Sequence, residues 1–348
     1  MSEHSGLHIK SIALLRLSAM GDVILCIPAV KTLQACYPHA KITWITTSSA
    51  YAILKGLSGI EFIIIDKPNN LKEYIAVYKQ LKPYYFDVLL CMQASFRANI
   101  IYPLIKSGRR IGFAVTAREG HRYFIKESIP GGQDHLLDSF MRFPEMLGCE
   151  NKIYTWDLAI PSEDYEWAKQ RLLSDKPRKI LAINLMASKQ ERCWPVERYI
   201  EVIKIAKKRW DIDILLTGGS SENEKECALN VENSVGFPIK NEVGNTTPKQ
   251  LAAMLSLADA LLSPDTGPLH LAVAVGTPVV GLYAVAPSTL SGPYFSHNLT
   301  IDKFSEAVRI FLKKDPKKIP WQTRVHTSKA MELITVDEVI EKLSMVFE

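Results

Sequence analysis

The sequence predicts an α/β protein made of two domains, each built around a parallel β-sheet. The chain has 348 residues, more than one ordinary hydrophobic core needs. Short β-branched apolar runs alternate with longer amphipathic segments, which is the pattern of successive β-α-β units. This pattern begins again after the polar stretch 174–179. We therefore expect a first domain at 1–165, a second at 178–330, and a terminal helical segment at 331–348 that packs on either domain.

The elements expected in each half follow from the apolar runs and their spacing. In the first half the expected strands are 12–17, 42–46, 62–66 and 86–92, with helices at 22–36 and 71–81. In the second half the expected strands are 180–185, 212–217, 260–263 and 278–283, with helices at 195–209, 222–231, 248–257 and 266–275. A last helix is expected at 336–347. Ligands of parallel sheets bind beyond the carboxyl ends of the strands, so the loops after these strands are the candidate sites.

Composition excludes several classes of protein. Hydrophobic residues make up 47% and charged residues 23%, as in a soluble globular protein, and no apolar run approaches the roughly 20 residues of a membrane-spanning helix. The N-terminus does not read as a signal peptide, so we expect a cytoplasmic protein. The six cysteines form no CxxC pair, which argues against a zinc site or a disulfide framework. A net charge of +5 is too small to predict nucleic-acid binding.

The charge is unevenly distributed, however. The segment 94–126 holds seven lysines and arginines and one acid, Glu119. This excess predicts either a solvated basic face or a surface that binds an anionic ligand.

The first candidate loop, 15–22, follows the first expected strand and ends in Gly21 and Asp22. A carboxylate at this place has two interpretations. It can accept hydrogen bonds from the free N–H groups of the next helix, or it can act as a general base on an acceptor hydroxyl. The motifs GxGxxG and GxxxxGK[ST] are absent from the chain, which weakens the dehydrogenase and P-loop kinase interpretations.

Two further loops carry charged residues at the carboxyl end of an expected strand. The loop 187–195 offers Ser188 and Arg192, and an arginine can bind diphosphate oxygens in a bidentate way; otherwise it is a solvated charge and Trp194 an anchor for the domain. The loop 216–222 ends in Glu222, which could accept hydrogen bonds from ribose hydroxyls or favour the start of a helix.

The most informative loop is 263–272, which contains Asp265, Thr266 and Gly267 before a helix. Gly267 permits close backbone approach, and the free N–H groups of the helix form a cradle for a diphosphate. Asp265 would orient the turn, because a carboxylate repels phosphate. His270 reads as a packed histidine more than as a catalytic one. No group of residues has the spacing of a metal site, and no DxD pair is present to hold a metal-nucleotide.

Taken together, these four loops resemble those of the ADP-heptose:lipopolysaccharide heptosyltransferases, along nearly the whole chain. The residues that carry the resemblance are 18–24 with Pro28 and Ala29, 188–195, 219–224, and 265–267 with 270–272. The resemblance implies the GT-B fold of two Rossmann-like domains. It also implies an inverting transfer of L-glycero-D-manno-heptose from ADP-heptose to the Kdo/heptose inner core, with no metal or other cofactor.

The resemblance also assigns roles. Asp22 matches the general base, Arg192 the cation at the donor phosphates, Glu222 the ribose-side acid, and Thr266 with Gly267 the diphosphate-binding turn. Donor binding is therefore expected at Ser188, Arg192, Glu222, Asp265, Thr266, Gly267 and His270.

The acceptor is expected to meet the basic segment. A lipid A–Kdo acceptor is anionic and lies at the cytoplasmic face of the inner membrane, where the protein would make peripheral contact. We expect Arg118 to contact it, with Arg97 and Arg122 next. The segments 116–119 and 291–294 resemble the enzyme that adds the first heptose to Kdo more than the one that adds the second.

Some positions depart from the family pattern. The family usually has lysine in place of Arg192 and a hydroxyl in place of Ala187, and Pro268 is unusual after its turn. Three alternatives remain open at this point: a related GT-B transferase with another nucleotide sugar, a sugar-nucleotide epimerase, and a non-catalytic binding protein. The basic segment argues against the epimerase, and Asp22 against the non-catalytic protein.

Overall fold

The computed structural model describes residues 9–114, 120–172 and 178–348, and it divides into two compact units. The first unit ends at Trp156 and the second begins at Asp157, except that Gln133–Leu136 belongs to the second. This division lies earlier than the boundary of 165 expected from the sequence. The reason is helix α6 (Ser162–Leu172), which packs against α9 (Pro248–Ser256) of the second unit. The two units are described separately below.

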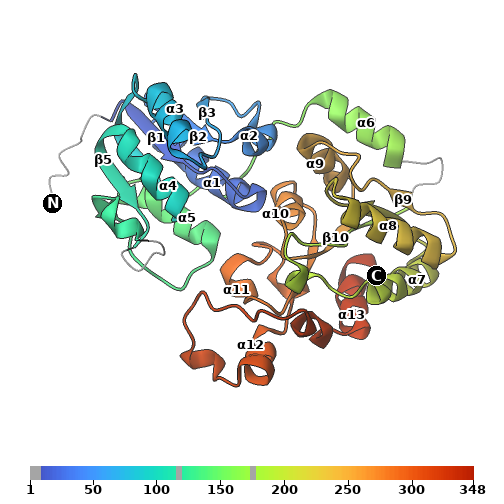
Figure 1. Ribbon diagram of the computed structural model, residues 1–348. Helices are drawn as coiled ribbons and strands as arrows, with labels where there is room; N and C mark the ends of the chain where they lie inside the picture. Colours follow the sequence, from blue (N-terminus) through green and yellow to red (C-terminus); the bar gives the residue numbers. More distant parts are fainter. Residues whose placement is uncertain (1–8, 115–119, 173–177) are drawn as a thin grey trace. The chain divides into compact units, whose positions relative to one another are not determined.

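The first unit contains a six-stranded parallel sheet in the order β3-β2-β1-β4-β5-β6 (Figure 1). Its strands are β1 (Ser11–Leu15), β2 (Lys41–Thr46), β3 (Ile60–Ile64), β4 (Tyr85–Cys91), β5 (Lys106–Gly112) and β6 (Glu127–Ser128). The central strand β1 pairs with β2 on one side and with β4 on the other, and four of its five residues are buried. An apolar run of this kind is what a strand covered on both faces requires.

Helices cover both faces of this sheet. They are α1 (Met20–Cys36), α2 (Ser48–Leu54), α3 (Leu71–Leu81), α4 (Phe96–Ile101) and α5 (Leu136–Met146). Helix α1 contacts α2, whereas α3 contacts α4 on the face that Ala13 and Leu15 of β1 present (Figure 1). Helix α3 begins where Asn70 accepts a hydrogen bond from the Glu73 N–H at 3.1 Å, a regular N-cap.

The second unit repeats this topology without a visible repeat in the sequence. Its six parallel strands lie in the order β12-β11-β10-β7-β8-β9. They are β7 (Ile180–Asn184), β8 (Asp213–Thr217), β9 (Lys240–Asn241), β10 (Ala260–Pro264), β11 (Val279–Tyr283) and β12 (Ile301–Asp302). Numbered within its unit, each sheet has the strand order 3-2-1-4-5-6 of the Rossmann fold, so the α/β fold class expected from the sequence is confirmed.

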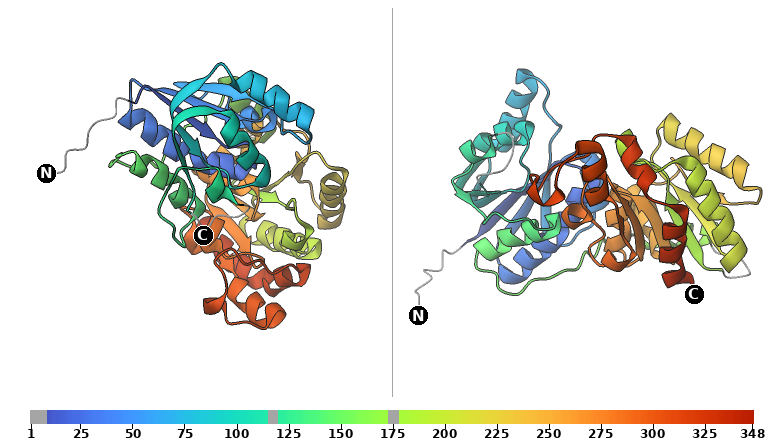
Figure 2. Two further views of the ribbon diagram at one scale, coloured as in Figure 1. Left: turned by 60° about the vertical axis from the view of Figure 1, so that its left-hand side comes forward. Right: turned by 90° about the horizontal axis from the view of Figure 1, so that it is seen from below.

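The helices of the second unit include the terminal segment. They are α6 and α9 with α7 (Val196–Trp210), α8 (Glu222–Val235), α10 (Gly267–Ala274), α11 (Ser288–Ser291), α12 (Phe304–Ala307) and α13 (Val336–Phe347). The last helix, α13, packs on α7 and β11, so the terminal segment belongs to the second unit. Figure 2 shows this helix beside the second sheet from two further directions. None of the helices in the described residues is both long and apolar enough to cross a membrane.

A buried histidine lies beside the carboxyl end of β5 in the first unit. His121 is fully buried, its Nδ1 lies 2.7 Å from Asn99 Oδ1, and its Nε2 accepts the Phe113 N–H at 3.2 Å. A ring that accepts at Nε2 must be neutral, and burial lowers the pKa of His121 to about 4.

We therefore expect the protein to lose stability as pH falls. The pKa of an unfolded histidine is near 6.5, so between about pH 6.5 and 4 the unfolded chain binds more protons at His121 than the folded chain. The free energy of unfolding should fall by up to about 1.4 kcal/mol per pH unit in this range. Urea unfolding at pH 7, 6, 5 and 4 measures it. His121→Gln should be less stable at pH 7 but lack this component of the slope; an unchanged slope would contradict the assignment.

Candidate functional site

Most of the candidate residues lie where the strand order reverses in each sheet. In the first unit the reversal lies between β1 and β4, and in the second between β7 and β10. In open α/β sheets the loops after the two central strands diverge at such a point, and ligands bind in the crevice between them. Asp22 follows β1, Arg97 follows β4, Arg192 follows β7, and Asp265 follows β10.

The central polar contact of the first unit is an ion pair between Arg16 and Asp22. Arg16 is only 8% exposed, and its Nη2 donates to Asp22 Oδ2. Its Nη1 donates to the Met92 carbonyl at 2.8 Å, and its guanidinium lies 5.4 Å from the centre of the Phe140 ring. The sequence alone does not distinguish Arg16 from a surface arginine, although it lies in the first candidate loop.

Asp22 occupies the first turn of α1, where both sequence interpretations remain possible. Its Oδ2 accepts the Ala19 N–H at 3.4 Å in addition to Arg16, so the carboxylate does help to start the helix. Its side chain is 34% exposed. Among the described residues Oδ1 accepts no hydrogen bond, which leaves its lone pairs for another donor. A carboxylate held at one oxygen and open at the other is the geometry that a general base needs.

The backbone that carries this pair is fixed from both neighbouring strands. Thr46 and Thr47, at the end of β2, donate their hydroxyls to the carbonyls of Arg16 and Leu17 at 2.9 and 2.8 Å. From the side of β4, Gln93 Oε1 accepts the Leu17 N–H at 2.8 Å. The position of Arg16 and Asp22 is therefore set by three adjacent strands rather than by the loop alone.

A cavity of about 460 Å³ opens beside this loop. The loops after β1, β3 and β4 line it together with the first turns of α3 and α4. The lining residues are Leu17, Ser18, Lys67, Pro68, Asn69, Tyr74, Gln93, Ser95, Phe96 and Arg97. Its volume lies within the roughly 300–1,000 Å³ range of small-molecule sites. Two cations line it, and Arg97 Nη2 donates to Asn69 Oδ1 at 2.9 Å. None of these ten described residues carries a carboxylate. The cavity therefore suits an anionic ligand that also bears hydroxyl groups.

The structure separates the cations of the basic segment. Arg97 lines the cavity, whereas Arg122 lies on another element, where its guanidinium stacks 4.7 Å from the Tyr123 ring centre. Arg109 forms a bidentate pair with Glu127 at 2.9 and 2.6 Å. Arg118 lies outside the described residues. Among the described cations of this segment, Arg97 therefore lines the cavity while Arg109 is paired with an acid, and Lys67, which lies before the segment, joins Arg97 at the cavity.

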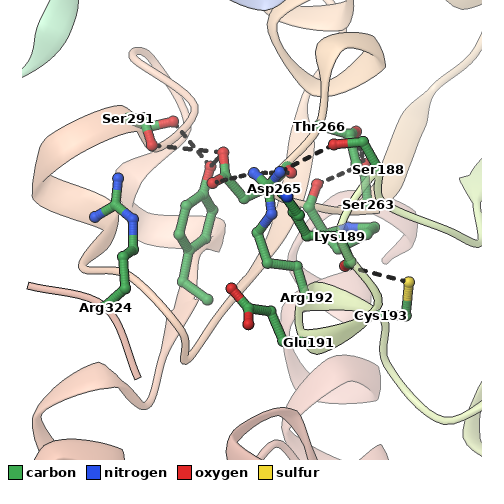
Figure 3. A network of polar contacts seen from close by, with 12 residues as sticks. Ser188, Lys189, Glu191, Arg192, Cys193, Ser263, Asp265, Thr266, Ser291 and Arg324 are labelled. Atoms are coloured by element: carbon green, nitrogen blue, oxygen red, sulfur yellow. Dashed lines mark hydrogen bonds and ion pairs between the residues drawn. The ribbon is translucent and has the colours of Figure 1, made fainter. Parts of the chain in front are cut away.

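In the second unit Arg192 joins the loops after β7 and β10. Its Nη1 donates to Asp265 Oδ2 at 3.0 Å and to the Asp265 carbonyl at 3.1 Å. Its Nη2 donates to Ser188 Oγ at 3.1 Å, so two of the expected donor residues and Arg192 form one cluster (Figure 3). Trp194 is buried, and its indole N–H donates to the Ile334 carbonyl, so it anchors this loop.

Asp265 is held on both sides of its carboxylate. Its Oδ1 lies 3.4 Å from both the Tyr283 hydroxyl and Ser291 Oγ, while its Oδ2 pairs with Arg192. The Tyr283 hydroxyl also lies 2.8 Å from the Ser291 carbonyl, and burial, followed by the nearby Asp265 charge, raises the pKa of Tyr283 well above its usual value. Asp265 therefore orients Arg192 as well as the turn (Figure 3). The sequence does not mark Tyr283 and Ser291 as site residues, because only folding brings them into contact with Asp265.

Helix α10 begins directly after this cluster. Thr266 is its N-cap residue and makes no side-chain cap; its hydroxyl instead lies 2.9 Å from Ser263 Oγ. Gly267 is the first residue of the helix, and the eight-residue helix directs its free N–H groups toward the loop. His270 is 5% exposed, as expected of a packed histidine.

Glu222 lies apart from the Arg192 cluster. It opens α8, is 80% exposed, and pairs with Lys225 at 2.8 Å. A second acid of this turn, Glu224, points back to the loop instead: its carboxylate accepts the Gly219 N–H at 2.9 Å and the Ser221 hydroxyl at 2.6 Å. The described residues contain no group of three or more His, Cys, Asp or Glu side chains that could hold a metal ion.

Comparison with known proteins agrees with this arrangement. Residues 74–309 match the model of glycosyltransferase family 9 (heptosyltransferase). The chain is 35% identical over 336 residues to the lipopolysaccharide core heptosyltransferase OpsX of Haemophilus influenzae, covering 96% of both chains. The chain belongs to glycosyltransferase family 9. The Escherichia coli lipopolysaccharide heptosyltransferase 1 is a more distant relative of this family 9 chain, 22% identical over 81% of it and 90% of the relative.

Solved family 9 structures share the fold. A glycosyl transferase family 9 protein of Veillonella parvula superposes with a TM-score of 0.81 at 21% identity over 99% of both chains. The E. coli heptosyltransferase WaaC with ADP superposes with a TM-score of 0.72 at 19% identity, over 96% of this chain and 99% of that one. The GT-B fold expected from the sequence is therefore confirmed, and this family 9 chain is a glycosyltransferase.

Proposed function

We propose that this chain transfers L-glycero-D-manno-heptose from ADP-heptose to Kdo in the inner core of a lipid A-linked acceptor. The reaction inverts the anomeric carbon, needs no metal, and takes place in the cytoplasm at the surface of the inner membrane. The observation that carries the proposal is the 35% identity to a lipopolysaccharide core heptosyltransferase over 96% of both chains. The geometry around Asp22 and Arg192 supports the chemistry.

In this mechanism Asp22 is the general base. Its Oδ1 takes the proton of an acceptor hydroxyl, and the oxygen attacks the anomeric carbon of heptose. The bond from that carbon to the diphosphate oxygen breaks, and its electron pair leaves with ADP. Arg16 holds the other carboxylate oxygen, so the base stays in one orientation throughout.

The leaving diphosphate would be bound by the second unit. Arg192 supplies a guanidinium, and the N-terminus of α10 supplies N–H groups and the positive end of a helix dipole. Ser188, Thr266 and Gly267 lie in the same two loops. Since these groups recognise phosphate rather than heptose, a transferase with another nucleotide sugar is the second candidate function.

The acceptor would bind in the first unit, in the cavity that Lys67 and Arg97 line. Kdo carries a carboxylate and several hydroxyls, and the cavity offers two cations with amide and hydroxyl side chains. Arg118 and Arg122, on the later part of the basic segment, would contact more distant phosphates of the acceptor. Glu222 would contact the ribose of the donor, and Glu224 of the same turn is the alternative residue for this contact.

The decisive experiment measures heptose transfer from ADP-heptose with and without a Kdo-bearing lipid A acceptor. Acceptor-dependent release of ADP and formation of the heptosylated lipid are expected. ADP-mannose and UDP-sugars serve as competing donors. Equal transfer from another donor would favour the second candidate, and epimerisation of the nucleotide sugar without acceptor would overturn the transferase assignment.

Asp22→Asn should lower kcat by about 100-fold to 10,000-fold, because an amide cannot take the proton. The donor KM should change little. The amide oxygen of the variant can still accept the N–H groups of Ala19 and Arg16, so the fold should persist, but the variant should be less stable because buried Arg16 loses its counter-charge. Steady-state kinetics measures the loss. Asp87→Asn is the matched control: Asp87 accepts the N–H groups of Lys10 and Ser11 at the opposite end of the sheet, so it should cost stability but not kcat. Turnover of Asp22→Asn near wild type would reduce Asp22 to a helix-starting residue.

Arg192→Ala should weaken the binding of ADP and of ADP-heptose alike, by about 10-fold to 100-fold. The substitution removes charged hydrogen bonds to phosphate and leaves the sugar contacts unchanged. Titration calorimetry with both nucleotides measures the change. Arg178→Ala removes a guanidinium that pairs with Asp211 and Asp213 elsewhere in the unit, and it should leave both affinities intact. An unchanged ADP affinity in Arg192→Ala would move the phosphate site to another loop.

Arg97→Ala should raise the acceptor KM by about tenfold and leave the ADP affinity unchanged. Added salt should reduce the difference in acceptor KM between the variant and the wild type, because salt screens the attraction between the acceptor and the cations of both proteins. Initial rates over a range of acceptor concentrations, at low and high salt, measure this. Lys41→Ala removes an exposed cation from the opposite end of the sheet and should behave as wild type. A variant with weakened donor binding and an unchanged acceptor KM would reverse the assignment of the two units.

A further inference from the structure

Helix α3 presents a second apolar stripe that the fold does not use. Leu71 is 75% exposed, Ile75 45% and Tyr78 41%. Their spacing of four and three residues places them on one side of the helix. A different side of the helix packs in the core through Val77 and Leu81. Large apolar side chains in a row on the surface mark a place where another surface binds.

Lysines flank this stripe. Lys72, Lys79 and Lys82 are exposed, and with the three apolar residues they form what we call the α3 face: Leu71, Lys72, Ile75, Tyr78, Lys79 and Lys82. The one acid of the helix, Glu73, does not offset them. Its carboxylate accepts the Asn69 N–H at 2.7 Å and the Asn70 amide at 2.6 Å, so it is engaged at the start of the helix.

The α3 face lies next to the proposed acceptor cavity. The cavity is lined by the loop that enters α3, including Lys67 and Asn69, and by Tyr74 of the helix itself. Helix α3 also contacts α4, whose first residue, Phe96, lines the cavity and is 66% exposed. Figures 1 and 2 show α3 on the outside of the first unit.

We propose that the α3 face docks on the surface of an anionic lipid bilayer. The inference rests on the proposed function, since a lipid-linked acceptor is presented by such a surface. Leu71, Ile75 and Tyr78 would enter the boundary between headgroups and acyl chains, and the three lysines would lie at the lipid phosphates. A helix with apolar residues beside lysines and no exposed acid has the chemistry of an interfacial helix.

Charge favours the bilayer over a second copy of this chain. Two copies that met through the α3 face would bring their lysines together without a carboxylate between them, and like charges repel. An anionic bilayer supplies the opposite charge over its whole surface. Three apolar side chains and three lysines give a weak, reversible attachment, which lets the enzyme leave one acceptor and reach the next.

Vesicle flotation of the full chain tests the proposal. The vesicles are phosphatidylcholine alone, and phosphatidylcholine with about 30% phosphatidylglycerol, each at low and at high salt. The wild type should bind the anionic vesicles at low salt and release them at high salt. Lys72→Gln/Lys79→Gln/Lys82→Gln should weaken binding by about fivefold for each lysine removed. Leu71→Ser/Ile75→Ser should weaken it by about tenfold or more.

Matched controls come from the second unit. Leu229→Ser/Met345→Ser removes two apolar residues that are each 55% exposed, and Lys204→Gln/Lys208→Gln/Lys314→Gln removes three exposed lysines. Both controls should bind vesicles as the wild type does. If they lose binding as much as the α3 variants, attachment is unspecific and the proposal fails.

Transfer assays separate this proposal from the proposed function. With a deacylated, soluble acceptor the α3 variants should turn over like wild type, and with acceptor in anionic vesicles they should be slower. Equal losses with both acceptors would overturn docking as the role of this face. Vesicle binding by a wild type that transfers no heptose would support the docking surface and reject the function. Sedimentation that shows a wild-type dimer, lost in Leu71→Ser/Ile75→Ser while vesicle binding persists, would assign the face to a second copy instead.

Discussion

The burial of one positive charge organises the first unit at the carboxyl end of its sheet. An isolated buried guanidinium costs several kcal/mol, so Arg16 must be compensated by its neighbours. The Met92 carbonyl, the Asp22 carboxylate and the Phe140 ring supply this compensation, and they come from the segments after β4, in α1 and in α5. Rotating Asp22 away would leave Arg16 unpaired. The constraint that stabilises the fold is therefore the one that fixes the proposed base.

The second unit reaches a similar arrangement with an unrelated sequence. Its strand order is the same, and an arginine and an aspartate again pair at the point where that order reverses. Here the pair spans two loops: Arg192 follows β7 and Asp265 follows β10. Topology explains the repetition, since only the loops of these two central strands diverge and leave room for charged side chains beside a ligand.

Much of the fold could be predicted from the sequence, because buried parallel strands are continuous apolar runs. The expected strand 42–46 and helix 71–81 match β2 and α3 almost residue for residue. The edge strands β6, β9 and β12 could not be predicted, since each has two residues and carries no periodic signal. The sequence places the start of α6 in the first domain, which is expected to end at 165, because the contact of α6 with α9 is tertiary and leaves no signal in the sequence.

The sequence predicts which loops form the candidate site, but it does not predict which side chains contact one another there. Asp22, Arg192 and Asp265 could be singled out because each follows an apolar run. Tyr283 could not, because its contact to Asp265 spans 18 positions of the sequence. Arg16 lies only six positions from its partner Asp22, but its burial and its contact to the Met92 carbonyl, 76 positions away, appear only in the fold. Likewise, the sequence of the basic segment shows how many charges are present, but it does not show which of them line the same cavity. Lys67, outside that segment, joins Arg97 only through the fold.

The pairing of Arg192 with Asp265 bears on how the enzyme would release its product. An arginine has five N–H donors, and Arg192 already makes three N–H···O contacts to Asp265 and Ser188. A diphosphate bound as proposed would therefore meet a cation whose charge is already partly offset. In the proposed reaction ADP carries more negative charge than the sugar nucleotide from which it forms. The fixed Asp265 carboxylate would oppose that added charge more than it would oppose the donor. In the proposed reaction the same salt bridge would therefore act against product inhibition and favour turnover.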